Sequence, residues 1–176
     1  VLPTAIGKTH IIRLVGTIFQ GIHVVIHPLL ALTADQVLAF MEGDEAYGYI
    51  TVHNTDETAA KSKSFLQSII KHGDSLEKNS SSTVFYLVSP QFMALHQEFV
   101  DMLLRCNARG TLRSVSIDEA HLFAQHGSSF RSEIRKISST FFAKIFSKEK
   151  HPIIMALTAT LSNEDLAVLQ DLLHVK

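Results

Sequence analysis

The chain has 176 residues, of which 46% are hydrophobic, and this composition fits one domain with a substantial core. Its formal net charge is −1, so no overall positive field indicates a nucleic-acid partner, and binding to a polyanion would require a local stripe of positive charge. Cys106 is the single cysteine, which excludes an internal disulfide and agrees with a reducing compartment. No apolar run approaches the roughly 20 residues that span a bilayer, and no charged segment precedes a short apolar one, so we expect an intracellular protein without a membrane partner.

Segments with helical periodicity alternate with short apolar runs along the chain. In chain order the pattern predicts a helix at 8–20, a strand at 22–26, a helix at 34–41, a strand at 47–52, a helix at 57–71, a strand at 84–88, a helix at 91–105, a strand at 112–117, a helix at 130–146, a strand at 153–157 and a helix at 163–173. We find no internal repeat, and the polar segment 73–83 is expected to be a flexible loop. The alternation indicates an α/β fold with right-handed crossovers and a parallel sheet covered by helices on both faces.

The segment Pro3-Thr4-Ala5-Ile6-Gly7-Lys8-Thr9 has the residue types of a loop that cradles phosphates. Backbone N–H groups of residues 4–9 and the amino end of the following helix would face the phosphates, Lys8 would reach the β- and γ-oxygens, and the Thr9 hydroxyl would hold Mg²⁺. The alternative is that Gly7-Lys8-Thr9 only begins a helix.

A second motif, Asp118-Glu119-Ala120-His121, follows the apolar run that ends at Ile117. Asp118 is therefore expected at the carboxyl end of a buried strand, where open α/β sheets bind ligands. There it would hold Mg²⁺ through water, Glu119 would orient or deprotonate the attacking water, and His121 would sense the γ-phosphate. An N-cap with a favourable first-turn carboxylate is the alternative. The two motifs together predict a nucleoside triphosphatase that uses ATP and Mg²⁺.

Three further segments make a resemblance specific. Residues 27–37 include His27-Pro28-Leu29 and Asp35-Gln36-Val37, residues 86–90 read Tyr-Leu-Val-Ser-Pro, and residues 156–160 read Ala-Leu-Thr-Ala-Thr. With the two motifs above, they resemble in collinear order motifs I, Ia, Ib, II and III of superfamily 2 helicases, and most closely those of the RecQ-type DNA helicases. The resemblance implies a three-layer RecA-like P-loop domain over residues 1–176, the ATP-binding half of an ATP-dependent DNA helicase that moves 3′ to 5′.

The same resemblance implies roles in DNA binding and coupling. Motifs Ia and Ib contact the backbone of single-stranded DNA, which makes Pro28, Leu29, Ser89 and Pro90 candidates. Motif III couples hydrolysis to strand movement, a role that falls to Thr158 and Thr160. Residues 125–131 stand where RecQ-type proteins carry an aromatic-rich loop that senses DNA. The residues that inherit this role are Gln125, Phe130, which could stack on a base, and Arg131, which could meet a phosphate. The alternative for Phe130 is a place on the apolar face of the following helix.

The chain also departs from the family pattern. Ala5 stands where the family usually has a glycine, and if that position requires a positive φ the added Cβ costs about 1 kcal/mol. His126, Ser128 and Ser129 replace the tryptophan, histidine and aspartate of the aromatic-rich loop. By the resemblance, we expect that most of the strand leading into the nucleotide loop and the second motor domain, which supplies an arginine finger, are not part of this chain. We therefore expect a fragment of a longer helicase.

Alternatives of other classes stay open. The chain could be a truncated or degenerate module that binds nucleotide or nucleic acid without turnover, or a remnant with a structural role alone. A DEAD-box RNA helicase is the alternative family, but His121 and Thr158-Ala159-Thr160 favour DNA, with RNA the less expected substrate. A nuclear location follows if the source is eukaryotic. His23 and His27, four residues apart in a predicted strand without a cysteine or acidic partner, are predicted to be structural.

Overall fold

A computed structural model of the chain describes residues 7–27, 50–54, 63–77, 82–125 and 128–175. Its centre is a sheet in the order β2-β3-β1-β4-β5. All four neighbouring pairs of strands are parallel. The strands are β1 (Ile22–Ile26), β2 (Ile50–Asn54), β3 (Thr83–Val88), β4 (Leu112–Ile117) and β5 (Ile153–Ala156). The predicted α/β fold with a parallel sheet is confirmed.

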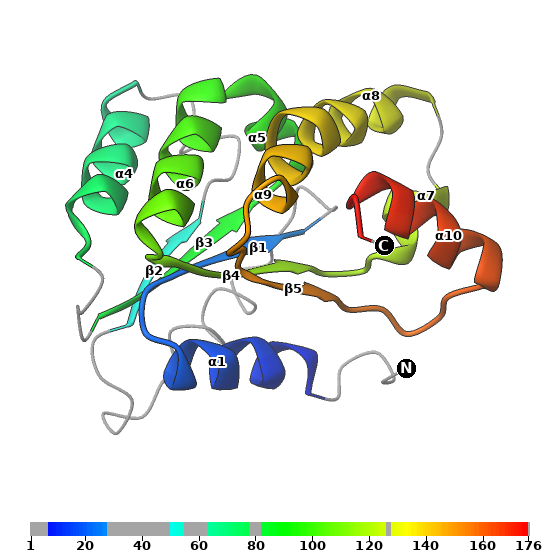
Figure 1. Ribbon diagram of the computed structural model, residues 1–176, viewed down its shortest axis with the longest axis horizontal. Coiled ribbons are helices and arrows are strands. Elements are labelled where there is room, and N and C mark those ends of the chain that lie inside the picture. Colours follow the sequence, from blue (N-terminus) through cyan, green and yellow to red (C-terminus); the bar gives the residue numbers. More distant parts are fainter. Residues whose placement is uncertain (1–6, 28–49, 55–62, 78–81, 126–127, 176) are drawn as a thin grey trace.

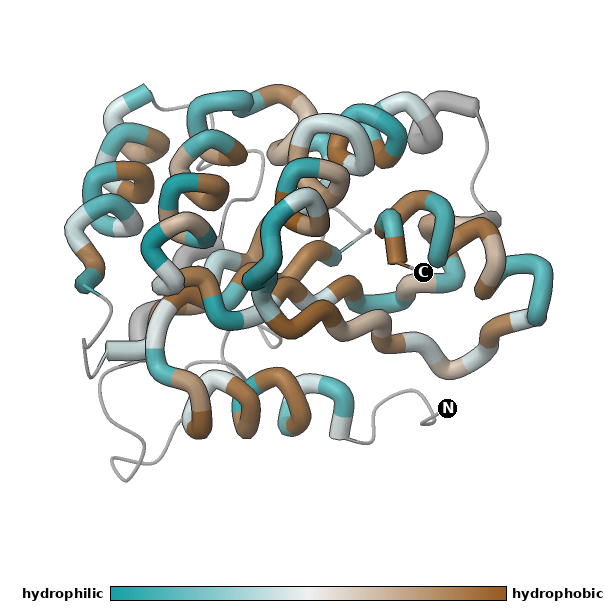
Figure 2. The backbone as a smooth tube through the Cα atoms, in the orientation of Figure 1, coloured by the Kyte–Doolittle hydropathy of each residue, from teal (hydrophilic) through white to brown (hydrophobic). Residues whose placement is uncertain are grey.

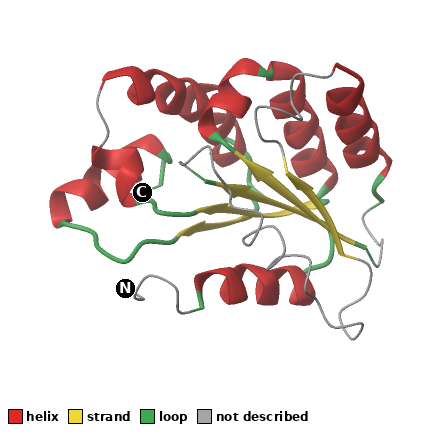
Figure 3. Ribbon diagram, turned by 180° about the vertical axis from the view of Figure 1, so that it is seen from behind, coloured by secondary structure: helices red, strands yellow, loops and turns green. Residues whose placement is uncertain are grey.

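Helices cover both faces of this sheet, as predicted (Figures 1 and 3). On one face lies α1 (Lys8–Ile18). The other face carries α4 (Lys63–Ser75), α5 (Pro90–Leu95), α6 (Gln97–Arg109), α8 (Ser128–Ile137) and α9 (Ala143–Phe146), with a π-helical turn (Ser138–Phe142) joining the last two. Two further helices, α7 (His121–Gln125) and α10 (Asn163–Leu172), contact each other beyond the carboxyl ends of β4 and β5.

Alternation along the strands divides the interior into two cores. Figure 2 shows largely hydrophobic strands and helices α4 and α6 that mix hydrophobic with hydrophilic residues. The larger core lies under α4 and α6 and includes Ile22, Val24 and Ile26 of β1. The smaller core lies under α1 and contains four buried residues, Ile12, Val25, Phe85 and Leu87.

Two of the predicted helices are interrupted in the structure. The helix expected at 91–105 is divided into α5 and α6 at His96, whose φ of −109° and ψ of 78° are not helical. Ser89 begins α5, because its Oγ accepts a hydrogen bond from the Phe92 N–H at 3.1 Å. The helix expected at 130–146 begins earlier and contains the π-helical turn, which buries Phe141 and Phe142 together.

Other expectations fall partly outside the described residues. The helix predicted at 34–41 lies outside them, as do residues 47–49 of the second predicted strand and 57–62 of the third predicted helix. The loop predicted at 73–83 is wrong at both ends, because α4 continues to Ser75 and β3 begins at Thr83. Gly73 lies within α4, where its missing side chain leaves room for Met102 of α6. A Cβ at this position would overlap the Met102 sulfur.

Candidate active site

Lys8 joins the start of α1 to the end of β4. It is the first residue of α1, and its Nζ forms an ion pair with Glu119 Oε1 and lies 3.5 Å from Asp118 Oδ1. The lysine side chain is 11% exposed and the two carboxylates are 18% and 20% exposed, so the three charges are partly removed from water. The fold therefore brings together the two motifs that stand 110 residues apart in the sequence.

Gly7 sets the direction in which α1 begins. Its φ of 85° is in the left-handed region, where a side chain would be strained although nothing lies within 4 Å of a Cβ built there. The first turn of α1 contains no acidic residue. By contrast α10 begins with Glu164 and Asp165 and is capped by the hydroxyl of Ser162. The positive end of the α1 dipole is therefore not neutralised by a carboxylate in its own first turn.

Asp118 is held from several directions. Its backbone N–H donates to the Ile26 carbonyl at 2.9 Å, which extends the pairing of β4 with β1 by one residue. Its Oδ1 accepts a hydrogen bond from the Glu119 N–H at 2.9 Å, and its Oδ2 lies 3.3 Å from His27 Nε2. One oxygen thus faces Lys8 and the other faces His27.

The charges in the site shift one another's protonation. Burial raises the pKa of Asp118, but the hydrogen bond from His27 and the positive charge of Lys8 outweigh it, so that this pKa lies below its ordinary value. Burial likewise lowers the pKa of Lys8, and the bond to Glu119 with the negative charge of Asp118 outweighs it, so that this pKa is raised. Lys8 is therefore a cation and Asp118 an anion at neutral pH.

His121 extends the site from β4 to β5. Its Nδ1 lies 2.7 Å from Thr158 Oγ1 and 3.4 Å from Glu119 Oε2. The Thr158 hydroxyl donates to the Thr160 carbonyl at 2.8 Å, so it accepts from His121. Glu119 itself has a φ of 46°, a left-handed conformation that is uncommon for a residue with a side chain and marks a constrained turn.

His27 has a partner in the site that the sequence reasoning missed. The expectation that no acidic residue accompanies His27 is wrong, because its Nε2 lies 3.3 Å from Asp118 Oδ2, while its structural role stays a prediction. The same expectation fits His23, which is fully buried between the Ser114 hydroxyl and the Phe19 carbonyl. The signal was the polar residue after each apolar strand: His27 follows β1 and Asp118 follows β4, and the two strands are neighbours.

The remaining candidates differ in how much can be said of them. Thr9 lies half-buried in the first turn of α1. Ser89 and the buried Pro90 begin α5 at the end of β3, where the Val88 carbonyl accepts from the His27 N–H at 2.9 Å. The other candidates for phosphate and DNA contacts lie outside the described part of the chain or have undescribed side chains. They are Thr4, Ala5, Ile6, Pro28 and Leu29 in the first group, and Gln125, Phe130 and Arg131 of α7 and α8 in the second.

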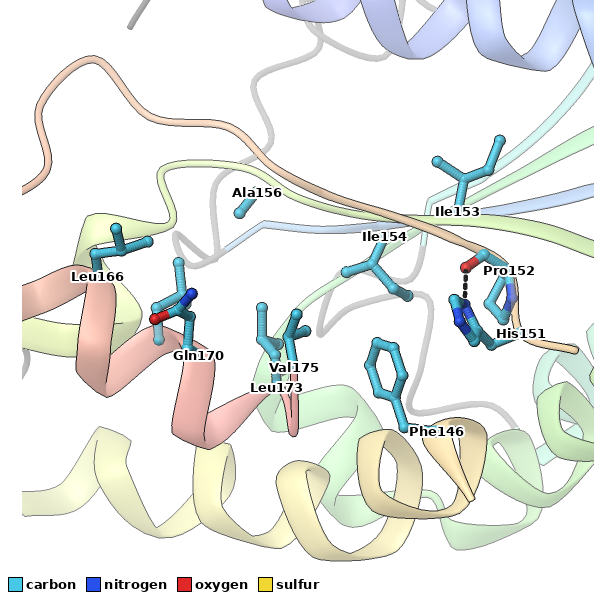
Figure 4. Close-up of a pocket in the computed structure, with 11 residues that line it drawn as sticks. Phe146, His151, Pro152, Ile153, Ile154, Ala156, Leu166, Gln170, Leu173 and Val175 are labelled. Atoms are coloured by element: carbon cyan, nitrogen blue, oxygen red, sulfur yellow. Dashed lines mark hydrogen bonds between the residues drawn. The ribbon is translucent and has the colours of Figure 1, made fainter. Parts of the chain in front are cut away.

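An apolar pocket of about 400 Å³ lies apart from these residues. Figure 4 shows its walls, with Phe146 of α9 and Ile154 of β5 near each other and with Leu166 and Gln170 of α10 at the other end. None of the residues lining it is one of the candidates named above. A triphosphate would lose its hydration against such walls without gaining hydrogen bonds, so this pocket is not the phosphate site.

Comparison with known proteins agrees with this geometry. The profile of the DEAD/DEAH box helicase family matches residues 1–168. The ATP-dependent DNA helicase RecQ of Bacillus subtilis is 31% identical over 93% of the chain. The ATP-dependent DNA helicase Q-like 2 of Arabidopsis thaliana is 29% identical over 96%, and the ATP-dependent DNA helicase Q1 of Mus musculus is 28% identical over 99%.

The chain spans about a quarter of the length of these relatives, with 24%, 22% and 25% of them covered in that order. In the part of the chain that the structure describes, no helix is both long and apolar enough to cross a membrane. The profile match and these relatives together show that the chain belongs to the DEAD/DEAH box helicase family, as a relative of the RecQ-type DNA helicases.

Proposed function

We propose that this chain is the ATP-binding motor domain of an ATP-dependent DNA helicase. The observation that carries the proposal is the placement of Lys8 against both Asp118 and Glu119 at the carboxyl edge of a parallel sheet. A cation that reaches two carboxylates across this edge is suited to exchange them for the β- and γ-phosphates of a nucleotide. The names of the relatives, all of them DNA helicases, support the same assignment.

The nucleotide phosphates would lie at the amino end of α1. Gly7 turns the chain so that the first N–H groups of the helix point outward, and its dipole favours negative charge there. Lys8 would leave Glu119 for the phosphates, which carry more negative charge than one carboxylate. Thr4, Ala5 and Ile6 would complete the loop, as the sequence motif predicts.

The donor set fits Mg²⁺. Thr9 and Asp118 offer a hydroxyl and a carboxylate, the oxygen ligands that hard cations prefer. No group of three or more His, Cys, Asp or Glu side chains is arranged as a metal site among the described residues. Mg²⁺ takes one or two protein ligands and completes its shell with water and phosphate. When bound, the ion would neutralise charge on the phosphates.

Glu119 and His121 would then act in hydrolysis. Once Lys8 turns to the phosphates, the Glu119 carboxylate is released to orient the attacking water and accept its proton. His121, held by Thr158, would report the γ-phosphate to the loop between β5 and α10, which contains Thr158 and Thr160. Thr158 and Thr160 would in this way couple the state of the nucleotide to movement of that loop.

DNA is the proposed track. Ser89 and Pro90 lie at the carboxyl end of β3, next to the end of β1 and on the same edge as the nucleotide residues. Pro28 and Leu29 follow β1, and Gln125, Phe130 and Arg131 lie in α7 and α8. We assign these positions to single-stranded DNA, and strand separation to the longer protein, in which a second motor domain would close the cleft. The alternative, a module that binds nucleotide or nucleic acid without turnover, differs from this proposal in that it would not hydrolyse ATP.

The experiment is Mg²⁺-ATP binding by calorimetry, with wild type compared with Lys8→Ala and thermal unfolding recorded for each. Lys63→Ala is the matched control, because Lys63 is also the first residue of a helix and is exposed. We expect micromolar binding by wild type and by the control, and at least a tenfold loss for Lys8→Ala, since charge-assisted contacts to phosphate are about twice as strong as neutral ones. A folded wild-type chain that does not bind would overturn the proposal.

Adding single-stranded DNA and RNA of the same sequence tests the track. Binding to DNA that strengthens or weakens when Mg²⁺-ATP is added supports a coupled motor domain, because linked sites must affect each other equally. Preference for RNA would replace DNA in the proposal. Nucleotide binding without any nucleic-acid binding would favour the alternative of a degenerate module, in this case one that no longer binds nucleic acid.

A further inference from the structure

His27 and Asp118 are the end of a series of side-chain pairs between β1 and β4. The two strands are parallel and in register, with His23 opposite Ser114, Val25 opposite Ser116 and Ile26 opposite Ile117. His27 and Asp118 each follow the last of these pairs by one residue, and the Asp118 N–H donates to the Ile26 carbonyl at 2.9 Å. In a parallel pair every second residue faces the same side, so His23, Val25 and His27 lie on the side that α1 covers.

The two histidines of this series have different partners. His23 is held within the sheet by Ser114 and the Phe19 carbonyl. His27 is 4% exposed, and its Nε2 lies 3.3 Å from Asp118 Oδ2. The Asp118 oxygen carries no proton at neutral pH, so Nε2 must carry the hydrogen of this bond.

We propose that His27 is a positioning residue for Asp118. Its Nε2–H holds Oδ2, while the Glu119 N–H holds Oδ1, so that the carboxylate plane is fixed and Oδ1 stays on the side of Lys8. A hydrogen bond to a carboxylate that itself assists a metal commonly orients it, and loss of such a partner costs about 10- to 100-fold in metal affinity. The inference rests on the proposed nucleotide site, because Asp118 is useful in this orientation only if a metal-bound phosphate meets it.

The test compares nucleotide affinity with and without the metal. Calorimetry of a non-hydrolysable ATP analogue, in Mg²⁺ and then in excess chelator, gives the factor by which Mg²⁺ tightens binding. His27→Leu removes the donor, and His27→Gln keeps an N–H donor at about the reach of Nε2. Ser116→Ala is the matched control, since Ser116 is buried in β4 two residues before Asp118 and its Oγ has no hydrogen-bond partner among the residues that the structure describes.

We expect His27→Leu to reduce the Mg²⁺ factor by about tenfold while metal-free affinity changes by less than about twofold, and His27→Gln to restore most of it. A merely structural histidine would lower both affinities or neither, and the ratio would stay that of wild type. An unchanged ratio in a folded His27→Leu chain overturns the inference but leaves the nucleotide site standing. Failure of the wild-type chain to bind nucleotide overturns the proposed function itself.

A second readout needs no nucleotide. Nitrogen NMR of the imidazole ring in the free protein, assigned by the signal that is lost in His27→Gln, reports which ring nitrogen carries hydrogen. The geometry requires hydrogen on Nε2. A ring with hydrogen on Nδ1 alone would contradict the bond to Asp118 and with it the positioning role.

Discussion

His121 Nδ1 lies 2.7 Å from Thr158 Oγ1, and this hydrogen bond joins the turn after β4 to the loop after β5. The neighbouring backbone is tied as well, because the Ala120 N–H donates to the Leu157 carbonyl at 2.9 Å. Since the single hydrogen of the Thr158 hydroxyl goes to the Thr160 carbonyl, the histidine must donate. Through these two hydrogen bonds, a movement of Glu119 or His121 would also displace Thr158.

A double-mutant cycle measures this link. Urea unfolding of His121→Ala, Thr158→Val and the double variant should give a coupling free energy of about 1 kcal/mol, the usual net value of such a bond. His121→Ala combined with Thr160→Val is the control, because Thr160 takes part through its backbone carbonyl and its side chain is exposed. Coupling near zero for the Thr158 pair would show that the bond does not contribute to stability.

Glu119 is expected to matter for hydrolysis more than for binding. Glu119→Gln keeps the size and shape of the side chain but removes the base, so turnover should fall by about 10²-fold or more. Affinity for Mg²⁺-ATP should change little, because Lys8 leaves Glu119 when phosphate binds. Single-turnover hydrolysis with protein in excess measures the rate, and Glu164→Gln at an exposed position of α10 is the control. Equal rates for Glu119→Gln and wild type would remove Glu119 from the mechanism.

Acid should destabilise the fold through His23. Burial, opposed by the bond to the Phe19 carbonyl and aided by the charge of Arg113, lowers the pKa of this histidine from 6.5 to about 4. The unfolded chain therefore binds more protons between these values, so stability is complete above pH 6.5 and is lost as pH falls towards 4. The loss is at most about 3 kcal/mol.

Urea unfolding between about pH 7.5 and about pH 4.5 gives this slope. His23→Gln keeps a donor for the Phe19 carbonyl but cannot take up a proton, so its slope should be smaller than that of wild type. His10→Gln, at an exposed position of α1, is the control variant. If His23→Gln and wild type lose stability in parallel as the solution is acidified, other groups carry the acid response.

Local pattern predicted the strands better than the helices. Ile22–Ile26 and Leu112–Ile117 were predicted with their observed bounds, because a buried parallel strand is a short apolar run between turns. The break at His96 was not predicted, since residues 91–105 keep one helical periodicity; in the structure α5 packs against α8 and α6 packs against α4. The π-helical turn was not predicted either, and in it Phe141 and Phe142 are buried with ring centroids 5.3 Å apart.

The site residues that belong to short motifs could be predicted from the sequence. Gly7-Lys8-Thr9 and Asp118-Glu119 carry residue types that phosphate and Mg²⁺ require, and the alternating pattern predicted that Asp118 would lie at the carboxyl end of a buried strand. His27 could not be found in this way. Its partner Asp118 lies 91 residues away, and only the register of β1 against β4 shows that the two are opposite each other. The hydrophobic pattern of one strand shows which face it buries, but it does not show which residue of a distant strand lies opposite.

The contact of α1 with the sheet depends on the absence of a side chain at Gly16. A Cβ there would overlap the ring of Phe85, which is fully buried and also packs against His23 with ring centroids 5.1 Å apart. The ring cannot move without disturbing the small core under α1. Gly16→Ala is therefore expected to destabilise the protein by about 1–2 kcal/mol, although alanine favours helix by about 1 kcal/mol.

Gly73→Ala is the matched comparison. It is also a buried helical glycine, but its Cβ would meet the sulfur and the terminal methyl group of Met102, an unbranched side chain that can shift more easily than a ring. We expect Gly73→Ala to change the free energy of unfolding by less than about 1 kcal/mol. Combining Gly16→Ala with Phe85→Leu should recover part of the loss, because the shorter side chain leaves room for the methyl group. If Gly16→Ala unfolds at the same urea concentration as wild type, α1 has room to move away from the sheet, and the position of Lys8 is less fixed than the structure indicates.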